Sequence, residues 1–112
     1  MDFKDAECIR ELMWVEGPLL GLYTLRGKTY LVSWVDVNVE HVWLIIEISD
    51  DDLGLYMRQE ISLLEVERRS PNLYLQEGMF EKAQAAHLNF EDLPDDLRPT
   101  EDSFYDDSLS RE

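Results

Sequence analysis

The chain contains a long stretch without acidic residues, although acidic side chains are abundant elsewhere. Residues 17–35, GPLLGLYTLRGKTYLVSWV, have no Asp or Glu, whereas the whole chain has 25 of them and a formal net charge of -15. Charged side chains are rarely buried without a partner, so an acid-free stretch of this length indicates buried structure. It is rich in β-branched and aromatic residues, which favour strands. The stretch therefore predicts the centre of a β-sheet.

Three successive strands are predicted in and after this stretch. Residues 19–25 and 29–37 are separated by an Arg-Gly-Lys turn at 26–28, and residues 41–48 follow a second turn at 38–40. Strands with such short connections pair antiparallel, so the pattern indicates a meander. Apolar residues occupy both alternating sets of the middle strand, which predicts that both faces of the sheet are largely covered.

Two short helices are predicted after the third strand. Ser49 precedes three aspartates at 50–52, and apolar residues then recur at helical spacing. A Ser N-cap followed by acidic residues is typical of a helix start. We prefer this interpretation to a calcium loop, which needs oxygen ligands at alternating positions. Ser62 and Glu65 have the spacing of a capping box, which predicts a second helix over residues 63–69.

The region after the second helix is less regular. Residues 72–76 predict another strand. Residues 79–90 are open to two interpretations, because their alanines favour a helix and their alternation favours a strand. We favour the strand, since it would extend the sheet begun by residues 72–76. Pro94 and Pro99 indicate the end of regular structure.

Together these patterns predict an α+β fold. We expect a curved antiparallel sheet of about four to five strands with two short helices, and an SH3-like, partly open barrel is one version of it. Residues 1–90 are predicted to form a single domain. Residues 91–112 are predicted to form an acidic C-terminal arm that docks on the domain in part. Trp34 and Trp43 are expected to pack inside the sheet, whereas Trp14 is either a core residue or an exposed contact residue.

The sequence has little that indicates catalysis. Cys8 is the only cysteine, so an internal disulfide framework and a cysteine-based zinc site are excluded. No phosphate-binding loop or nucleophile motif accompanies His41 or His87, the two histidines. We therefore predict a protein that is not an enzyme, with no catalytic, metal or cofactor-binding residues and no cofactor. A hydrolase that uses two carboxylates stays as an alternative.

The charge restricts the partners and the location. The basic groupings are Arg26 with Lys28 and Arg68 with Arg69, which are too few for the phosphate contacts of direct nucleic-acid binding. Anionic lipid headgroups would repel the chain, so a membrane partner is not expected. The first residues carry charges of both signs without an apolar segment, which predicts no secretory signal and a cytoplasmic location.

The arm is the most specific candidate for a functional site. Residues 91–112 contain nine acids and two arginines, and Phe104 and Tyr105 lie between pairs of acids. Such a pattern is typical of a linear interaction segment, although the arm could instead fold back on its own domain. The candidate partner-binding residues are Asp92, Asp95, Asp96, Glu101, Asp102, Phe104, Tyr105, Asp106 and Asp107.

Three segments carry a resemblance to a family. These are Glu60–Glu65 (EISLLE), Asp92–Pro94 (DLP) and Pro99–Tyr105 (PTEDSFY), with the aromatic strand Tyr30–Trp34 before them. The chain resembles an uncharacterised family of small acidic bacterial proteins, and the likeness covers most of residues 19–109. The resemblance implies a bacterial or phage origin and no particular activity. Arg98 departs from the family pattern, in which an aromatic or aliphatic residue precedes the second proline.

We therefore predict a binding protein whose anionic face engages a basic surface on a protein partner. The partner would be a nuclease, a toxin, a defence complex or a DNA-binding protein. The chain would then act as an inhibitor that mimics nucleic acid, or as an antitoxin or immunity protein. A second possibility is a small accessory or sensor domain that docks through its aromatic tail, and a carboxylate-based hydrolase is the third.

Overall fold

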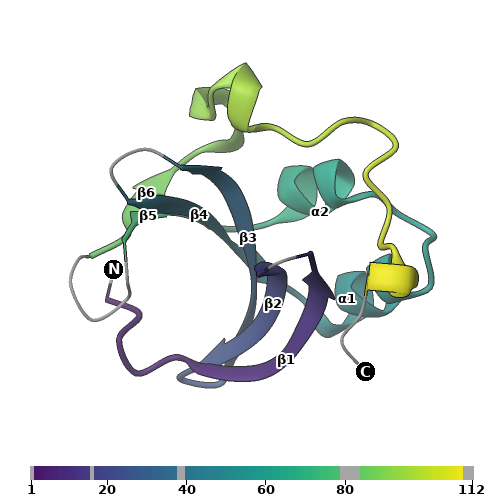
Figure 1. Ribbon diagram of the computed structural model, residues 1–112, viewed down its shortest axis with the longest axis horizontal. Coiled ribbons are helices and arrows are strands. Elements are labelled where there is room, and N and C mark those ends of the chain that lie inside the picture. Colours follow the sequence, from purple (N-terminus) through teal and green to yellow (C-terminus); the bar gives the residue numbers. More distant parts are fainter. Residues whose placement is uncertain (1, 16, 38–39, 79–83, 110–112) are drawn as a thin grey trace.

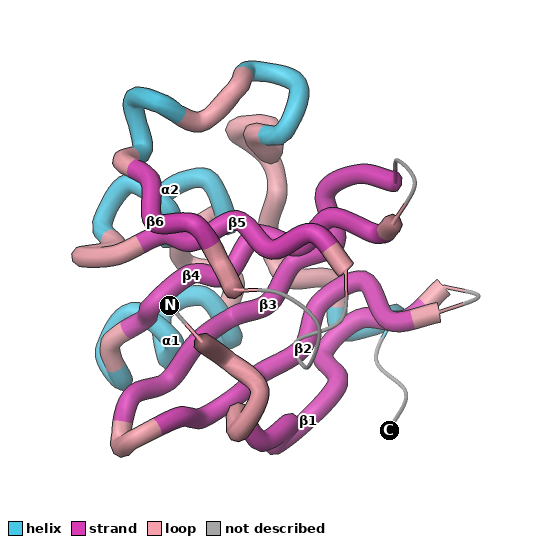
Figure 2. The backbone as a smooth tube through the Cα atoms, turned by 90° about the vertical axis from the view of Figure 1, so that its left-hand side faces the viewer, coloured by secondary structure: helices cyan, strands magenta, loops and turns pink. Residues whose placement is uncertain are grey.

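A single antiparallel sheet forms the frame of the computed structural model, which describes residues 2–15, 17–37, 40–78 and 84–109. Within these residues the sheet has six strands, and each pairs with the next along the chain, as Figure 2 shows. The strands are β1 (Glu7–Trp14), β2 (Pro18–Leu25), β3 (Lys28–Val37), β4 (His41–Ile48), β5 (Leu73–Glu77) and β6 (Ala86–Leu88). The predicted antiparallel meander is confirmed, with more strands than expected.

Two short helices connect β4 to β5, in the positions that the capping residues predict. They are α1 (Asp50–Met57) and α2 (Leu63–Arg69). The Ser49 hydroxyl accepts a hydrogen bond from the Asp52 amide, so the three aspartates do form a helix start. The Ser62 hydroxyl accepts from the Glu65 amide at 3.2 Å, which is one half of the predicted capping box. The Glu65 carboxylate instead accepts from Arg69, one helical turn further along, at 3.0 Å.

The turn between β2 and β3 has the predicted residues and a tight geometry. Leu25 pairs directly with Lys28, which leaves Arg26 and Gly27 as a two-residue turn. Both turn residues have positive φ, 52° for Arg26 and 79° for Gly27. Positive φ at both positions gives the hairpin turn whose twist matches that of the strands, and glycine adopts it without a steric penalty. The strands β2 and β3 are therefore paired by a strictly local signal.

One face of the sheet, which we call the helix-covered face, packs against the helices and the arm. Figure 1 shows α1, α2 and the arm on the same side of the sheet. Leu31 and Ile46 pair across β3 and β4 on this face. Its buried residues come from the strands, from both helices and from the arm: Leu12, Leu20, Leu31, Leu44, Ile46, Ile48, Tyr56, Leu63, Val66, Leu73, Leu93 and Tyr105. Residues distant in the sequence thus share one core.

The opposite face, which we call the inner face, is the one around which the sheet curves in Figure 1. Its side chains are mainly aromatic, and residues 2–6 lie against it. The Phe3 ring meets the edges of the Tyr30 and Tyr74 rings, with centroid distances of 5.1 and 5.3 Å. Leu25, Val32, Ile45 and Ala85 complete the buried part of this smaller cluster. Among the described residues, it is therefore a short N-terminal segment rather than a helix that packs on the inner face.

Some sequence predictions need correction. The strand β1 was not expected, because charged residues interrupt its apolar pattern. It is an edge strand with one partner, β2, and with bulges in its register, so exposed charges are tolerated along it. The prediction that Trp34 packs inside the sheet is wrong: this side chain is 36% exposed near the end of β3. Trp43 packs against the inner-face cluster and is half-buried.

The ambiguous region contains a short strand. Residues Ala86–Leu88 form β6, which pairs with β5 and extends the sheet in the expected way. A single turn of 3-10 helix follows at Phe90–Asp92, so the strand does not continue to residue 90. The part of the prediction that falls on residues 79–83 lies outside the described residues, as do Asn38 and Val39 of the predicted second turn.

Candidate functional site

The C-terminal arm, residues 91–109 of the described structure, is docked on the domain by two buried side chains. Leu93 and Tyr105 are 2% and 4% exposed and belong to the helix-covered core. The Tyr105 ring lies 5.7 Å from that of Tyr56 in α1, measured between centroids. Gln59 donates a side-chain hydrogen bond to the Tyr105 carbonyl at 2.7 Å. The arm is thus held at two points along its length.

A third attachment joins the arm to the first turn of α2. The amide of Leu63 donates to the Ser103 carbonyl at 2.8 Å, and the amide of Leu64 donates to the Ser103 hydroxyl at 3.2 Å. The first amides of a helix have no partner within the helix itself. Ser62 satisfies the next one, at Glu65. The arm therefore completes the capping of α2, and the helix in turn fixes the course of the arm.

Arg98 holds the arm in a compact path. Its guanidinium donates to the Phe90 carbonyl at 2.9 Å and to the Glu91 carbonyl at 3.3 Å, and it lies 4.7 Å from the centroid of the Phe90 ring. It also forms an ion pair with Asp95 at 3.1 Å. Arg98 thereby clamps the start of the arm.

The predicted partner-binding acids all lie on the outside of this docked arm. Asp92, Asp95, Asp96, Glu101, Asp102, Asp106 and Asp107 are exposed. Among the described residues, Asp95 alone of these acids has a cationic partner. Phe104 is 45% exposed, whereas Tyr105 is buried. The two adjacent aromatics therefore have different roles: Tyr105 anchors the arm, and Phe104 faces solvent beside the acids.

A buried carboxylate, which the sequence analysis did not single out, lies beneath the arm. Glu67 in α2 is fully buried, and its two carboxylate oxygens have no hydrogen-bond partner in the described structure. Burial raises the pKa of Glu67 to about 8, and the positive charge of Arg98 opposes this shift in part. The burial of Glu67 could have been predicted from helical spacing, because Glu67 lies one turn beyond Leu63 and Leu64, which are both buried.

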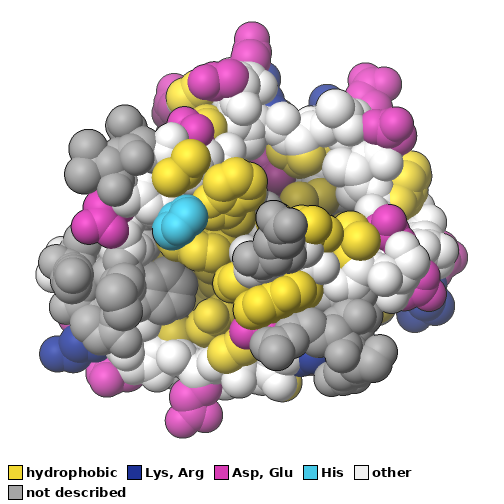
Figure 3. Space-filling view, viewed as in Figure 1, with side chains coloured by type: hydrophobic (Ala, Val, Ile, Leu, Met, Phe, Trp, Pro, Cys, Tyr) yellow, Lys and Arg dark blue, Asp and Glu magenta, His cyan; other side chains and the backbone are white. Residues whose placement is uncertain are grey.

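Two adjoining cavities open on the inner face, and we call them together the apolar hollow. The first has a volume of about 360 Å³ and is lined by Lys4, Ala6, Cys8, Glu11, Pro18, Gly21, Tyr23, Val32, Trp43 and Gly78. The second has a volume of about 390 Å³ and is lined by Val15, Gly17, Pro18, Leu19, Trp34, His41 and Trp43. Pro18 and Trp43 line both. Figure 3 shows hydrophobic side chains gathered around the centre of this view and acidic ones mostly at its border.

Gly21 contributes to the shape of the first cavity. A Cβ atom at this position would lie 2.8 Å from the Tyr23 ring, so a larger residue would displace that ring. Burial, together with the neighbouring Cys8, raises the pKa of Tyr23 to about 12. The phenol is therefore neutral at ordinary pH. The wall of the cavity over β2 is thus a flat aromatic surface without charge.

Three aromatic rings form a row at the second cavity. Trp34 and Trp43 face each other across β3 and β4. The Trp34 indole N–H donates to Nδ1 of His41 at 3.0 Å, which places the proton of a neutral His41 ring on Nε2. The ring centroids of His41 lie 6.2 Å from those of Trp34 and 6.3 Å from those of Trp43. This hydrogen bond fixes the ring of Trp34, which is more exposed than that of Trp43.

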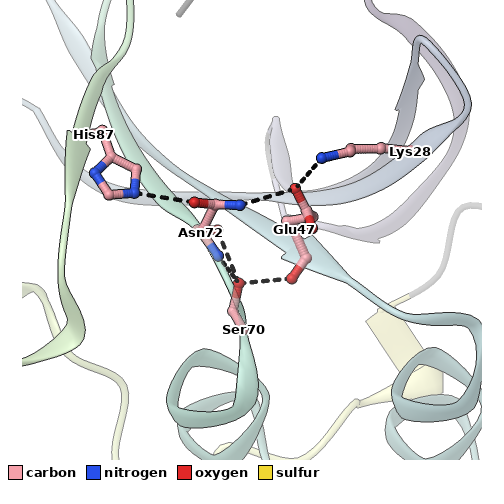
Figure 4. Close-up of polar contacts among 5 residues, drawn as sticks. All are labelled: Lys28, Glu47, Ser70, Asn72 and His87. Carbon is pink, nitrogen blue, oxygen red and sulfur yellow. Dashed lines mark hydrogen bonds and ion pairs between the residues drawn. The ribbon is translucent and has the colours of Figure 1, made fainter.

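A network of polar side chains lies at the other end of the sheet. Asn72 donates to the Glu47 carboxylate at 3.3 Å, and Lys28 pairs with the same oxygen at 3.4 Å (Figure 4). Since the Asn72 amide nitrogen donates to Glu47, its oxygen accepts from His87 Nε2 at 3.1 Å. The Ser70 hydroxyl contacts the backbone carbonyls of Glu47 and Asn72. This network joins β3, β4 and β6 through Ser70 and Asn72, which lie just before β5, as expected of a structural role.

The hydrolase alternative needs two converging acids and one raised carboxyl pKa at the same cavity. Glu47 and Asp50 line a cavity of about 270 Å³ beside this network, together with Lys28. The carboxyl group with a raised pKa is Glu67, which is fully buried beneath the arm and lines none of the three cavities described here. The two requirements are therefore met in different places.

Two further kinds of feature concern metal binding and membrane insertion. The described residues contain no group of three or more His, Cys, Asp or Glu side chains placed to hold a metal ion. None of their helices has both the length and the hydropathy that a bilayer crossing requires. Comparison with models of protein families, with curated proteins and with solved structures found no match.

Proposed function

We propose that the chain is a non-enzymatic acidic binding protein that engages a basic surface of a protein partner through its docked arm. The observation that carries this proposal is the attachment of the arm at Leu93, Ser103 and Tyr105, which leaves its acids exposed at fixed positions. A surface that is ordered before binding loses less conformational entropy when a partner docks. The acids therefore form a preorganised anionic surface rather than a flexible tail.

The net charge of -15 supports the same function. A strong negative potential accelerates the encounter with a basic partner, and salt weakens that effect. A partner that normally binds phosphates would present such a basic surface. We accordingly propose that the protein acts as a nucleic-acid-mimicking inhibitor, or as an antitoxin or immunity protein, against a nuclease, a toxin, a defence complex or a DNA-binding protein.

A second candidate function is an accessory or sensor domain that docks through the aromatic tail. The exposure of Phe104, at 45%, is the observation that favours it. Tyr105 contributes to this function indirectly, since it fixes the backbone from which Phe104 projects. The two candidates differ in their expected salt dependence, because an apolar contact is much less sensitive to salt than ion pairing.

We also propose a fold type, a family and a location for the protein. The curvature of the sheet around the apolar hollow supports comparison with SH3-like, partly open barrels (Figure 1). The segments EISLLE, DLP and PTEDSFY support membership of the family of small acidic bacterial proteins, and with it a bacterial or phage origin. We further propose a cytoplasmic location.

The test uses two variants of equal charge. The arm variant carries Asp96→Asn, Glu101→Gln and Asp107→Asn, and the control carries Asp5→Asn, Glu7→Gln and Asp51→Asn; all six residues are exposed. The partner is captured from bacterial lysate at low salt and identified, and its affinity for each purified variant is then measured. Rim charges contribute a few tenths to one kcal/mol each, so the arm variant should bind roughly tenfold more weakly.

The control should retain the affinity within about a factor of two, since its charges lie outside the proposed site. Binding should also weaken strongly when the salt concentration is raised to about 0.5 M. Equal losses in the two variants would mean that only net charge matters. Binding that is insensitive to salt but lost on Phe104→Ala would favour the accessory-domain function instead.

A further inference from the structure

We propose that the apolar hollow is a second binding site, which receives an arginine-bearing segment of a protein partner. The guanidinium group would stack on the indole rings of Trp34 and Trp43, and the aliphatic part of the side chain would contact Pro18 and Leu19. The proposal does not depend on the arm, which lies on the helix-covered side of the sheet. The function proposed above involves the arm and gives the inner face no role, whereas this second site would give it one.

The aromatic composition of the hollow is the first argument. Trp34 is among the few large hydrophobic side chains that are exposed in the described structure, and it borders a cavity of about 390 Å³ with Trp43 and His41. Exposed tryptophan beside a cavity is unusual for a surface that has no partner, because burying the ring is favourable. The hydrogen bond from the Trp34 indole N–H to His41 satisfies the polar edge of the ring, so the rest of this partly exposed side chain is apolar and aromatic.

The distribution of charge is the second argument. Strands β1, β3 and β5 end, and β2 and β4 begin, at the same end of the sheet, as their registers show. Residues 11–15, 17–21, 32–37, 40–45 and 74–78 form this end, and they contain no Lys or Arg. They do contain Glu11, Asp36, Glu40 and Glu77. Within the described residues, the second cavity thus lies at an end of the sheet that has four acidic and no basic side chains.

Acids also lie close to the first cavity. Glu11 lines it, and a Cβ atom on Gly78 would lie 3.6 Å from a carboxylate oxygen of Glu40. Lys4 lines the same cavity at the side where residues 2–6 cross the inner face. We therefore place the cation at the second cavity, beside Trp34 and Trp43, and a neighbouring apolar side chain of the partner in the first.

The chemistry of arginine fits this combination better than that of other side chains. A cation is attracted to the face of an indole ring, and tryptophan is the strongest partner among the aromatic residues. The guanidinium is planar and weakly hydrated, so it stacks on a flat ring with a smaller desolvation penalty than an ammonium group has. An anionic segment would be repelled by the four acids at this end of the sheet, and a neutral one would gain nothing from them.

The experiment is a titration of the intact protein with synthetic peptides, observed through its indole N–H resonances. The probe is acetyl-(Gly-Arg)4-amide, and the comparison peptides replace Arg with Lys, Gln or Glu. Added at about 150 mM salt, the arginine peptide should shift the indole signals of Trp34 and Trp43 more than that of Trp14. The Lys peptide should bind more weakly, and the Gln and Glu peptides should cause no comparable shift.

Variants locate the site. Trp34→Leu keeps an apolar side chain without a π face and should weaken binding of the arginine peptide about fivefold, whereas Trp34→Phe should retain part of the affinity. Phe104→Leu is the matched control, because it removes an exposed ring from the arm, and it should leave the affinity unchanged. Circular dichroism and thermal unfolding of each variant check that the fold is retained.

Three outcomes would overturn the inference. One is an unchanged affinity in Trp34→Leu. Another is a loss of peptide binding in the arm variant with Asp96→Asn, Glu101→Gln and Asp107→Asn, while Trp34→Leu binds normally; this result would leave the proposed function of the arm intact. The third is concentration-dependent dimerisation that broadens the Trp34 signal without peptide, which would identify a second copy of the chain as the occupant.

Discussion

The two faces of the same sheet are covered in different ways. The strands contribute aliphatic side chains to the helix-covered face, which packs against α1, α2 and the arm. In the sequence the helices lie between β4 and β5, and the arm follows β6. The inner face is rich in aromatic side chains; within the described residues the segment 2–6 lies against it, and the apolar hollow opens on it at one end. From this difference we infer that the helix-covered face contributes most of the stability, whereas the inner face is available for binding.

The largest expected effect is a loss of stability when the arm no longer packs on the helix-covered face. Tyr105→Ala removes a buried ring that packs on Tyr56, so it should lower the free energy of unfolding by about 4 kcal/mol. Phe104→Ala, at the adjacent and exposed position, should change it by less than about 0.5 kcal/mol. Urea unfolding of both variants measures the difference. Similar losses at the two positions would mean that the arm is not anchored as described.

The next effect concerns the buried carboxylate on the same face. The pKa of Glu67 is about 8 in the folded protein, above its ordinary value of 4.5. Between these values the unfolded chain carries an ionised Glu67 and the folded protein a neutral one. The contribution of Glu67 to the free energy of unfolding should therefore be highest below about pH 4.5. It should decrease as the pH rises from 4.5 through 8.

Glu67→Gln keeps the shape of the side chain and removes its titration. At pH 8 this variant should be more stable than the wild type by about 4 kcal/mol, and the difference should shrink toward pH 5. Chemical unfolding across this pH range measures it, with Glu101→Gln as the control because Glu101 is exposed on the arm. A wild type and a Glu67→Gln variant with parallel pH profiles would show that Glu67 is ionised in the folded state.

The smallest effect concerns the unbalanced charge. At a net charge of -15, repulsion among the acids opposes the compact state, and salt screens it. Raising the NaCl concentration from about 20 to 150 mM should therefore raise the melting temperature by a few degrees. The arm variant with three neutralised acids should show a smaller rise. A melting temperature that stays flat or falls would mean that the charges are placed so that their repulsion is negligible.

The predictable part of the fold depends on residues that are neighbours in the sequence. The strands β2, β3 and β4, the turn at Arg26-Gly27 and the N-caps Ser49 and Ser62 were all expected from local patterns. Period-two alternation, positive-φ turn residues and capping hydroxyls act within a few residues, so a single sequence is enough to detect them. The strand β1 was missed because its pairing with β2 tolerates exposed charges that obscure its pattern.

The candidate sites were predicted less completely. The acids of the arm were identified from composition, and the structure places them on an exposed, docked segment. The opposite environments of Phe104 and Tyr105 were not predictable, because the two residues have the same acidic neighbours in the sequence. The apolar hollow was not predicted either, since Trp34 and Trp43 have the composition of core residues and only their position at an uncovered end of the sheet distinguishes them.

By itself, the sequence determined the strongly anionic surface, the antiparallel meander and the starts of the two helices. These features follow from composition and from interactions between residues close along the chain. Only the tertiary structure decided that the arm caps α2, that Glu67 is buried beneath it and that the inner face keeps an open aromatic hollow. Each of these depends on contacts between segments distant in the sequence, whose geometry is set by how the sheet curves and what covers each face.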